Sequence, residues 1–204
     1  MGYSNFKRLK TVTKKFGLDA RLISIFPPEI EKVNPSSWLQ ETLEIGGLMP
    51  LTNEKNKSER IVSPILMELA KHYQAEITLF SGEDLIMRSE DDLAGECDFF
   101  FSLHPPKPYI DLPIISLVEA KDEDLEWGLA QCAAQVYGAY LYNQQEGNDI
   151  PVLYGCTTTG RDWQFFKFEN NIFYVDTTVM TNLPQVLGTW HWILSFYIDN
   201  FSKK

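Results

Sequence analysis

One stretch decides the fold that this sequence predicts, and it reads Pro113-Ile114-Ile115-Ser116-Leu117-Val118-Glu119-Ala120-Lys121. Its near-continuous apolar run is typical of a strand that is buried on both faces. Residues two apart on a strand point to the same side, so Glu119 and Lys121 project together where the run ends. Charged residues commonly end strands, so the tripeptide predicts little alone and its meaning depends on its surroundings.

The elements expected around this strand alternate between helix and strand. In chain order they are a helix at 58–73, strands at 76–80, 96–103 and 113–119, a helix at 124–142 and a strand at 152–156. This α-β-β-β-α-β order predicts an α/β domain whose helices cover both faces of a mixed sheet. A hairpin over 163–175 and a final helix at about 182–200 follow.

The region before this core has a different character. Residues 4–16 predict a basic helix, and Ser37 with Gln40 has the spacing of a capping box that opens a helix ending at Gly46-Gly47. Residues 49–57 are polar and contain Pro50, which indicates a linker. We therefore predict an N-terminal helical extension over 1–52 and an α/β domain over 53–204.

Composition indicates an ordinary globular protein. The chain has 204 residues, of which 44% are hydrophobic and 23% charged, and no apolar stretch approaches the roughly 18 residues that span a bilayer. Three cysteines without metal-ligand spacing argue for a reducing compartment, so we expect a cytoplasmic protein with no membrane partner. Aromatic residues of the C-terminal third, if exposed, make a homodimer plausible.

The formal net charge of −10 counts against tight, non-specific DNA binding, because nucleic-acid affinity rests on neutralising phosphates. An enzyme with a local basic rim remains compatible with this charge. Five basic residues, Lys7, Arg8, Lys10, Lys14 and Lys15, precede the first acidic residue. A solvated amphipathic helix is the favoured interpretation of this cluster, and phosphate contact is the alternative.

A second acidic residue, Asp98, lies on the strand that precedes the one ending in Glu119. If the strand that carries Asp98 pairs antiparallel with the next, its carboxylate lies beside that of Glu119, where both could share one divalent cation. Mg²⁺ (or Mn²⁺) prefers such oxygen ligands and takes one or two carboxylates plus water. A bound cation would activate water and polarise a phosphodiester. Lys121 could then position the water or stabilise the transition state.

Asp98 followed by Glu119-Ala120-Lys121 resembles the signature of the PD-(D/E)xK nuclease superfamily. The resemblance implies a three-layer α/β/α restriction endonuclease-like core with the element order above. Residues 58–66 are also similar to the first helix of the subgroup related to the N-terminal nuclease domain of type I restriction R subunits. A helical acidic residue joins the metal site there, and Glu59 matches it. In a regular helix Glu59 shares a face with Val62 and Leu66, so it can point inward toward the sheet. The resemblance thus implies a Mg²⁺-dependent DNA nuclease with Glu59, Asp98 and Glu119 at the metal.

The chain departs from the family pattern at two places. Cys97 stands where a proline often precedes the aspartate, and neither Gln131 nor Gln135 has the tyrosine four residues on that completes a common glutamine motif. We predict Gln131 as a substrate-facing or site-supporting residue, with an exposed polar position as an equal alternative. Two other functions stay open. They are a non-catalytic binding or assembly module with a vestigial site, and a hydrolase of another phosphate-bearing substrate.

Overall fold

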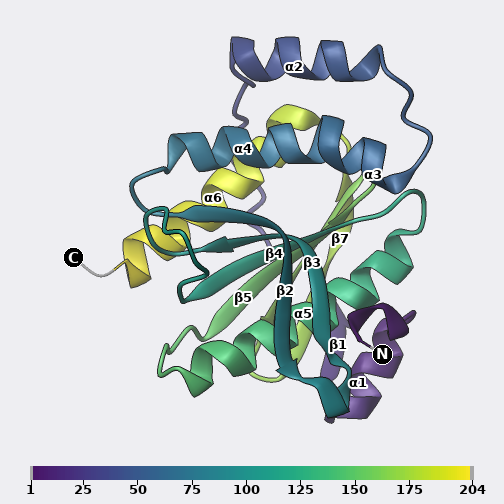
Figure 1. The fold of residues 1–204 in the computed structure, drawn as a ribbon, viewed down its shortest axis with the longest axis vertical. Coiled ribbons are helices and arrows are strands. Elements are labelled where there is room, and N and C mark those ends of the chain that lie inside the picture. The colour runs from purple at the N-terminus through teal and green to yellow at the C-terminus, as the bar shows by residue number, and fades with distance from the viewer. Residues whose placement is uncertain (1, 203–204) are drawn as a thin grey trace.

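In the computed structural model, which describes residues 2–202 apart from the side chains of 87–89, strand β4 (Ile114–Ala120) is buried along its whole length. The other strands are β1 (Asp19–Leu22), β2 (Thr78–Arg88), β3 (Leu93–Ser102), β5 (Val152–Thr158), β6 (Trp163–Glu169) and β7 (Ile172–Met180). They form one sheet with the order β1-β7-β6-β5-β4-β3-β2 (Figure 1). The sheet is mixed, because β4–β5 and β1–β7 are parallel and the other neighbours antiparallel.

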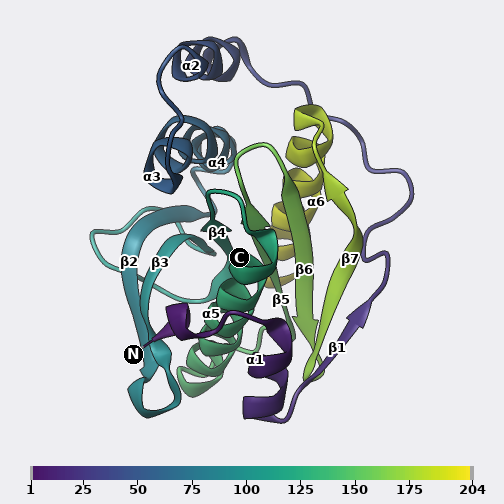
Figure 2. The same ribbon diagram turned by 90° about the vertical axis from the view of Figure 1, so that its right-hand side faces the viewer.

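Helices cover both faces of this sheet (Figure 2). They are α1 (Leu9–Phe16), α2 (Ser37–Gly47), α3 (Glu54–Lys57), α4 (Ser63–His72), α5 (Leu125–Gln145) and α6 (Leu183–Phe201). On one face α5 packs against β4 and β5, and α1 packs on α5. On the other face α4 contacts α6, whose Trp190 ring lies 5.3 Å from that of Phe165 in β6. The predicted α/β class and the mixed sheet are confirmed.

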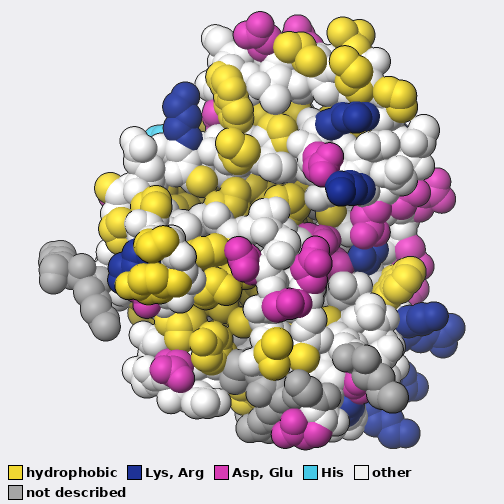
Figure 3. Space-filling model, viewed as in Figure 1, with side chains coloured by type: hydrophobic (Ala, Val, Ile, Leu, Met, Phe, Trp, Pro, Cys, Tyr) yellow, Lys and Arg dark blue, Asp and Glu magenta, His cyan; other side chains and the backbone are white. Residues whose placement is uncertain are grey.

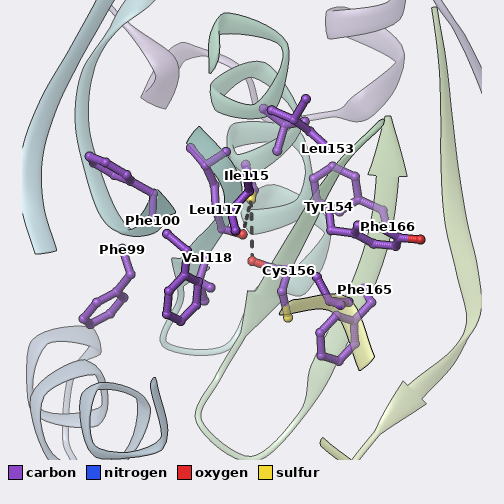
Figure 4. Close-up of a cluster of buried hydrophobic side chains, with 14 of the residues drawn as sticks. Phe99, Phe100, Ile115, Leu117, Val118, Leu153, Tyr154, Cys156, Phe165 and Phe166 are labelled. Carbon is purple, nitrogen blue, oxygen red and sulfur yellow. Dashed lines mark hydrogen bonds between the residues drawn. The ribbon is translucent and has the colours of Figure 1, made fainter. Parts of the chain in front are cut away.

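Helix α5 approaches the sheet closely because its buried side is made of small residues. Gly128, Ala130, Ala133, Ala134 and Ala139 are all buried. Cys132 Sγ consequently reaches the main chain of two strands, donating to the carbonyl oxygens of Leu117 at 3.7 Å and Cys156 at 3.5 Å (dashed lines in Figure 4). Figure 4 also shows the apolar side chains of β3, β4, β5 and β6 that fill the core. Helix α5 therefore packs directly on the main chains of β4 and β5.

The N-terminal region is more than a helical extension. Strand β1 pairs in parallel with β7, with Asp19 opposite Ile172. Tyr3 and Phe6, which precede α1, are buried in the core. All four residues of β1 are exposed, and although Ala20 and Leu22 alternate with Asp19 and Arg21, so short an alternation is a weak strand signal. The strand depends on pairing with its neighbour.

The helix predicted at 58–73 begins earlier and contains an irregular turn. Asn53 caps it by accepting a 2.9 Å hydrogen bond from the Asn56 amide, so helix replaces the end of the predicted linker. Between α3 and α4 the residues Ser58–Val62 form a π-helical turn. A π turn inserts a residue into the α-helical repeat, so side chains before it rotate away from the face that a 3.6-residue period assigns.

Three further differences concern boundaries and surfaces. Ser36 rather than Ser37 caps α2, accepting from the Leu39 amide at 3.2 Å. Strand β2 runs on to Arg88 instead of ending at Phe80, because it pairs with β3 over this length. Within residues 153–202, all of which are described, no aromatic side chain is exposed, so the aromatic surface that suggested a homodimer is absent.

In the described part of the chain, no helix combines the length and the apolar character needed to cross a membrane.

Candidate functional site

The register between β3 and β4 brings two acidic residues together. Phe99 lies opposite Val118 in this antiparallel pair, so the next step of the ladder sets Asp98 beside Glu119. Side chains at such opposed positions share a face, with Cβ atoms about 5 Å apart. Asp98 Oδ2 also accepts a 2.7 Å hydrogen bond from the Ala120 amide, which fixes its carboxylate against the end of β4. The predicted meeting of the two carboxylates is observed.

Glu119 is the buried centre of the cluster, with 1% of its surface exposed. Lys121 Nζ donates to Glu119 Oε1 at 2.7 Å, which brings the two charged residues of the tripeptide into direct contact. Gln135 Nε2, from helix α5, donates to Glu119 Oε2 at 2.8 Å. Both carboxylate oxygens are thus held by donors from different elements, which orients the group from the strand and from the helix.

Burial and nearby negative charges disfavour ionisation of the two carboxylates. Burial, followed by the negative charge of Asp98, raises the pKa of Glu119 to about 8 against the opposing effects of Lys121 and Gln135. Burial also raises the pKa of Asp98 to about 6, although the hydrogen bond from the Ala120 amide opposes this. Additional positive charge between the carboxylates would therefore stabilise their ionised forms.

Lys121 is surrounded by acidic groups. Burial lowers its pKa, but the charge and hydrogen bond of Glu119, together with the charge of Glu54, more than offset this and raise the pKa of Lys121 overall. Glu54 Oε2 lies 3.5 Å from Lys121 Nζ. Helix α3 is tied to the loop after β4 by Lys57, which contacts Asp122 Oδ1 at 2.6 Å. This ion pair holds Glu54 beside the cluster.

The structure does not bring Glu59 to the cluster as predicted. Its side chain is 60% exposed and lies 3.8 Å from Lys55. The π-helical turn at 58–62 shifts the register that had placed Glu59 on the inner face. Glu54, in the turn before, reaches Lys121 instead. Asn53 followed by Glu54 is a usable helix-start signal that would have found this residue.

The glutamine that contacts the cluster is Gln135 rather than the predicted Gln131. Gly128, Gln131 and Gln135 follow one another on a single side of α5. A Cβ at Gly128 would lie 2.8 Å from Lys121 Cγ, so this side of the helix faces the cluster. Gln131 is buried on it, at 9% exposure, but makes no hydrogen bond to Asp98 or Glu119 within residues 2–202.

A groove of about 620 Å³ adjoins the cluster. It is lined by Leu51, Lys57, Ile61, Asp122, Glu123 and the turn 159–162. The turn follows β5, whose Thr158 carbonyl accepts a 2.8 Å hydrogen bond from the Lys121 amide, so the groove lies at the carboxyl ends of β4 and β5. This is the edge at which open α/β sheets bind ligands. Another cavity, of about 520 Å³, lies at the opposite ends of these strands. Neither cavity is lined by Asp98, Glu119 or Lys121, and the groove comes nearest to them through Asp122, the residue after Lys121.

In the described part of the chain, no three His, Cys, Asp or Glu side chains are grouped so as to hold a metal ion. Mg²⁺ needs fewer protein ligands, because it usually keeps several waters and takes one or two carboxylates. Asp98 and Glu119 supply such a pair, and the charge of Lys121 opposes the rise in the pKa of both. The donor set therefore fits a hydrated divalent cation and does not fit a fully enclosed metal site.

Comparison of the sequence with family models and with curated proteins gives no match.

Proposed function

We propose that the chain is a Mg²⁺-dependent nuclease that hydrolyses DNA phosphodiester bonds at the cluster of Asp98, Glu119 and Lys121. The observation that carries the proposal is the 2.7 Å contact of Lys121 Nζ with Glu119 Oε1 directly beside Asp98. A carboxylate pair, of which Glu119 is buried and Asp98 partly buried, provides cation ligands, and one lysine provides a positive charge for a phosphoryl centre. The order α4-β2-β3-β4-α5-β5 is also the order that the family resemblance implies, which supports the proposal.

The residues of the cluster would have distinct roles in this reaction. Asp98 and Glu119 would hold Mg²⁺ (or Mn²⁺), which when bound activates a water and polarises the phosphodiester. The Ala120 amide and Gln135 keep these carboxylates in place through their hydrogen bonds. The Lys121 ammonium, whose pKa is raised further above neutral pH, would orient the water or neutralise charge on the phosphate.

A second candidate is a non-catalytic binding or assembly module that keeps this site in vestigial form. It is favoured by the full engagement of both Glu119 oxygens with Lys121 and Gln135. Among the described residues no group of three His, Cys, Asp or Glu side chains could hold a metal ion, which also favours this second candidate. In this case the ion pair would serve stability alone, and added Mg²⁺ would change nothing that the protein does.

Cleavage of plasmid DNA and of labelled single-stranded and duplex oligonucleotides, with Mg²⁺, Mn²⁺ or EDTA, separates these functions. We expect metal-dependent cleavage by the wild type and a loss of at least about 100-fold in Asp98→Asn, Glu119→Gln and Lys121→Ala. Glu44→Gln, at an exposed position of α2, serves as the matched control and should leave the rate unchanged. Absence of cleavage by the wild type, or cleavage that survives all three substitutions, would reject the nuclease function.

A further inference from the structure

Positive charge is concentrated at one end of this acidic chain. Five of the 18 Lys and Arg residues precede Asp19, so the remaining 13 share the rest of the sequence with all 28 Asp and Glu residues. From Asp19 onward the chain therefore carries a formal charge of −15, and this part repels a polyanion. A nucleic acid would be drawn to the N-terminal segment.

Most of these cations are free to bind anions. Lys7, Arg8, Lys10 and Lys14 are exposed, and none of them forms an ion pair within residues 2–202. Lys15 is the exception, because it contacts Asp92 at 2.9 Å. Lys10 and Lys14 are four residues apart in α1 and thus share one side of the helix. Figure 3 shows Lys and Arg side chains gathering at the lower right, where Figure 1 places α1.

The basic segment reaches the cluster through one aromatic ring. Lys7 Nζ and Lys121 Nζ each lie 5.6 Å from the centre of the Trp127 ring. From there α1 runs along α5, where the ring of Phe16 packs 4.9 Å from that of Tyr137. The Trp127 ring therefore links Lys7 to the proposed catalytic lysine, and the exposed lysines of α1 follow Lys7 along the chain.

The segment is also rigid enough to present these charges in fixed positions. Tyr3 and Phe6 are buried at 1% and 3% exposure, so both anchor the chain just before Lys7. Gly17, in the left-handed conformation, ends α1 with its amide bonded to Thr13. Anchors on either side of the basic residues reduce the conformational entropy lost when they bind a ligand.

We propose that Lys7, Arg8, Lys10 and Lys14 form a basic strip that binds the phosphate backbone of a nucleic acid and leads it across Trp127 to Lys121. The inference rests on the proposed function, whose substrate it describes. It explains how a chain with net charge −10 holds a polyanion, because the strip lies in the segment before Asp19, which has five basic residues and no acidic one. Phosphate contacts of this kind position the substrate without reading its sequence.

The test measures binding of a fluorescent oligonucleotide, single-stranded and as a duplex, by anisotropy in EDTA. All proteins carry Glu119→Gln so that binding is separated from cleavage. One variant adds Lys7→Ala, Lys10→Ala and Lys14→Ala. The matched control adds Lys32→Ala, Lys71→Ala and Lys107→Ala, which remove the same charge from exposed positions outside the strip. A third variant replaces the three strip lysines with arginine.

We expect the strip variant to bind at least about tenfold more weakly, and its log–log salt slope to shrink by about 2 for single strands and about 2.7 for a duplex. The arginine variant should bind like the parent, and so should the control triple. Equal affinities of the strip variant and its parent would overturn the inference, as would absence of binding by the parent. If the strip variant alone loses binding but wild type never cleaves, the inference stands and the nuclease function fails.

Discussion

Gln135 in helix α5 donates a 2.8 Å hydrogen bond to Glu119 Oε2 in strand β4. Both side chains are buried, so this bond couples the packing of the helix on the sheet to the orientation of the proposed metal ligand. Lys121 holds the other oxygen of the same carboxylate at 2.7 Å. The carboxylate is thus positioned before any ligand arrives.

Substituting Gln135→Leu removes the donor and leaves Glu119 Oε2 buried without a partner. The free energy of unfolding should fall by about 1–3 kcal/mol, the usual effect of an unsatisfied buried acceptor. Urea denaturation measures this change. Gln131→Leu is the matched control, because Gln131 lies one turn away on α5 and makes no hydrogen bond to the cluster within residues 2–202. Equal losses in the two variants would contradict the role assigned to Gln135.

Stability without metal should decrease as pH rises. The pKa of Glu119 is about 8 in the folded protein, against 4.5 for an ordinary glutamate. Between these values the folded state binds a proton that the unfolded state has released, so stability is lost as pH rises toward 8. Glu119→Gln should remove this loss, on the order of a few kcal/mol. Denaturation curves in EDTA from about pH 5 to about pH 9 compare the two proteins. If the free energy of unfolding changed with pH in the same way in both proteins, the pKa of Glu119 would not be raised and the prediction would be wrong.

Glu54 and Glu59 provide a matched pair for the acidic residue of the first helix. Glu54 lies 3.5 Å from Lys121 Nζ, whereas Glu59 is exposed and paired with Lys55. Glu54→Gln should reduce Mg²⁺-dependent cleavage by about tenfold or more, as substitutions next to metal ligands do. Glu59→Gln should leave the cleavage rate within about twofold. A larger loss of cleavage in Glu59→Gln than in Glu54→Gln would contradict the observed helix register and favour the one that the family resemblance implies.

We predict that alanine at position 128 destabilises the protein, although alanine is normally preferred to glycine inside a helix. A methyl group there would overlap Thr157 Oγ1 and approach Lys121 Cγ to 2.8 Å. Gly128→Ala should destabilise the protein by about 1–3 kcal/mol, which outweighs the gain in helix propensity. Gly47→Ala is the control, because no atom lies within 4 Å of a methyl group at that position in α2. Thermal unfolding should show a lower melting temperature for Gly128→Ala alone.

The sequence predicted best what depends on local pattern and on regular pairing. The apolar run of β4 indicated a strand buried on both faces, and the alternation of elements indicated a helix over the segment that became α5; the structure confirms both. The meeting of Asp98 with Glu119 followed from antiparallel pairing alone. These inferences hold because strand alternation and sheet register are simple geometric rules.

Other features depend on contacts that no short window of sequence contains. β1 is fully exposed and exists through its pairing with β7. The inward position assigned to Glu59 failed because one π-helical turn breaks the period that was assumed. Gln131 and Gln135 share a side of α5 one turn apart, and the position of the helix along β4, which no local pattern gives, decides which one reaches Glu119.

The most direct test of the account is Mg²⁺ titration calorimetry, which reports on the carboxylate pair without requiring a nucleic-acid substrate. Wild type should bind Mg²⁺ and release protons from Glu119 as it does so, with affinity that increases as pH rises toward 8. Asp98→Asn, which keeps an oxygen to accept the Ala120 amide, should abolish binding, while Glu44→Gln should not alter it. Failure of the wild type to bind Mg²⁺, or equal binding by Asp98→Asn, would contradict a metal site at Asp98 and Glu119.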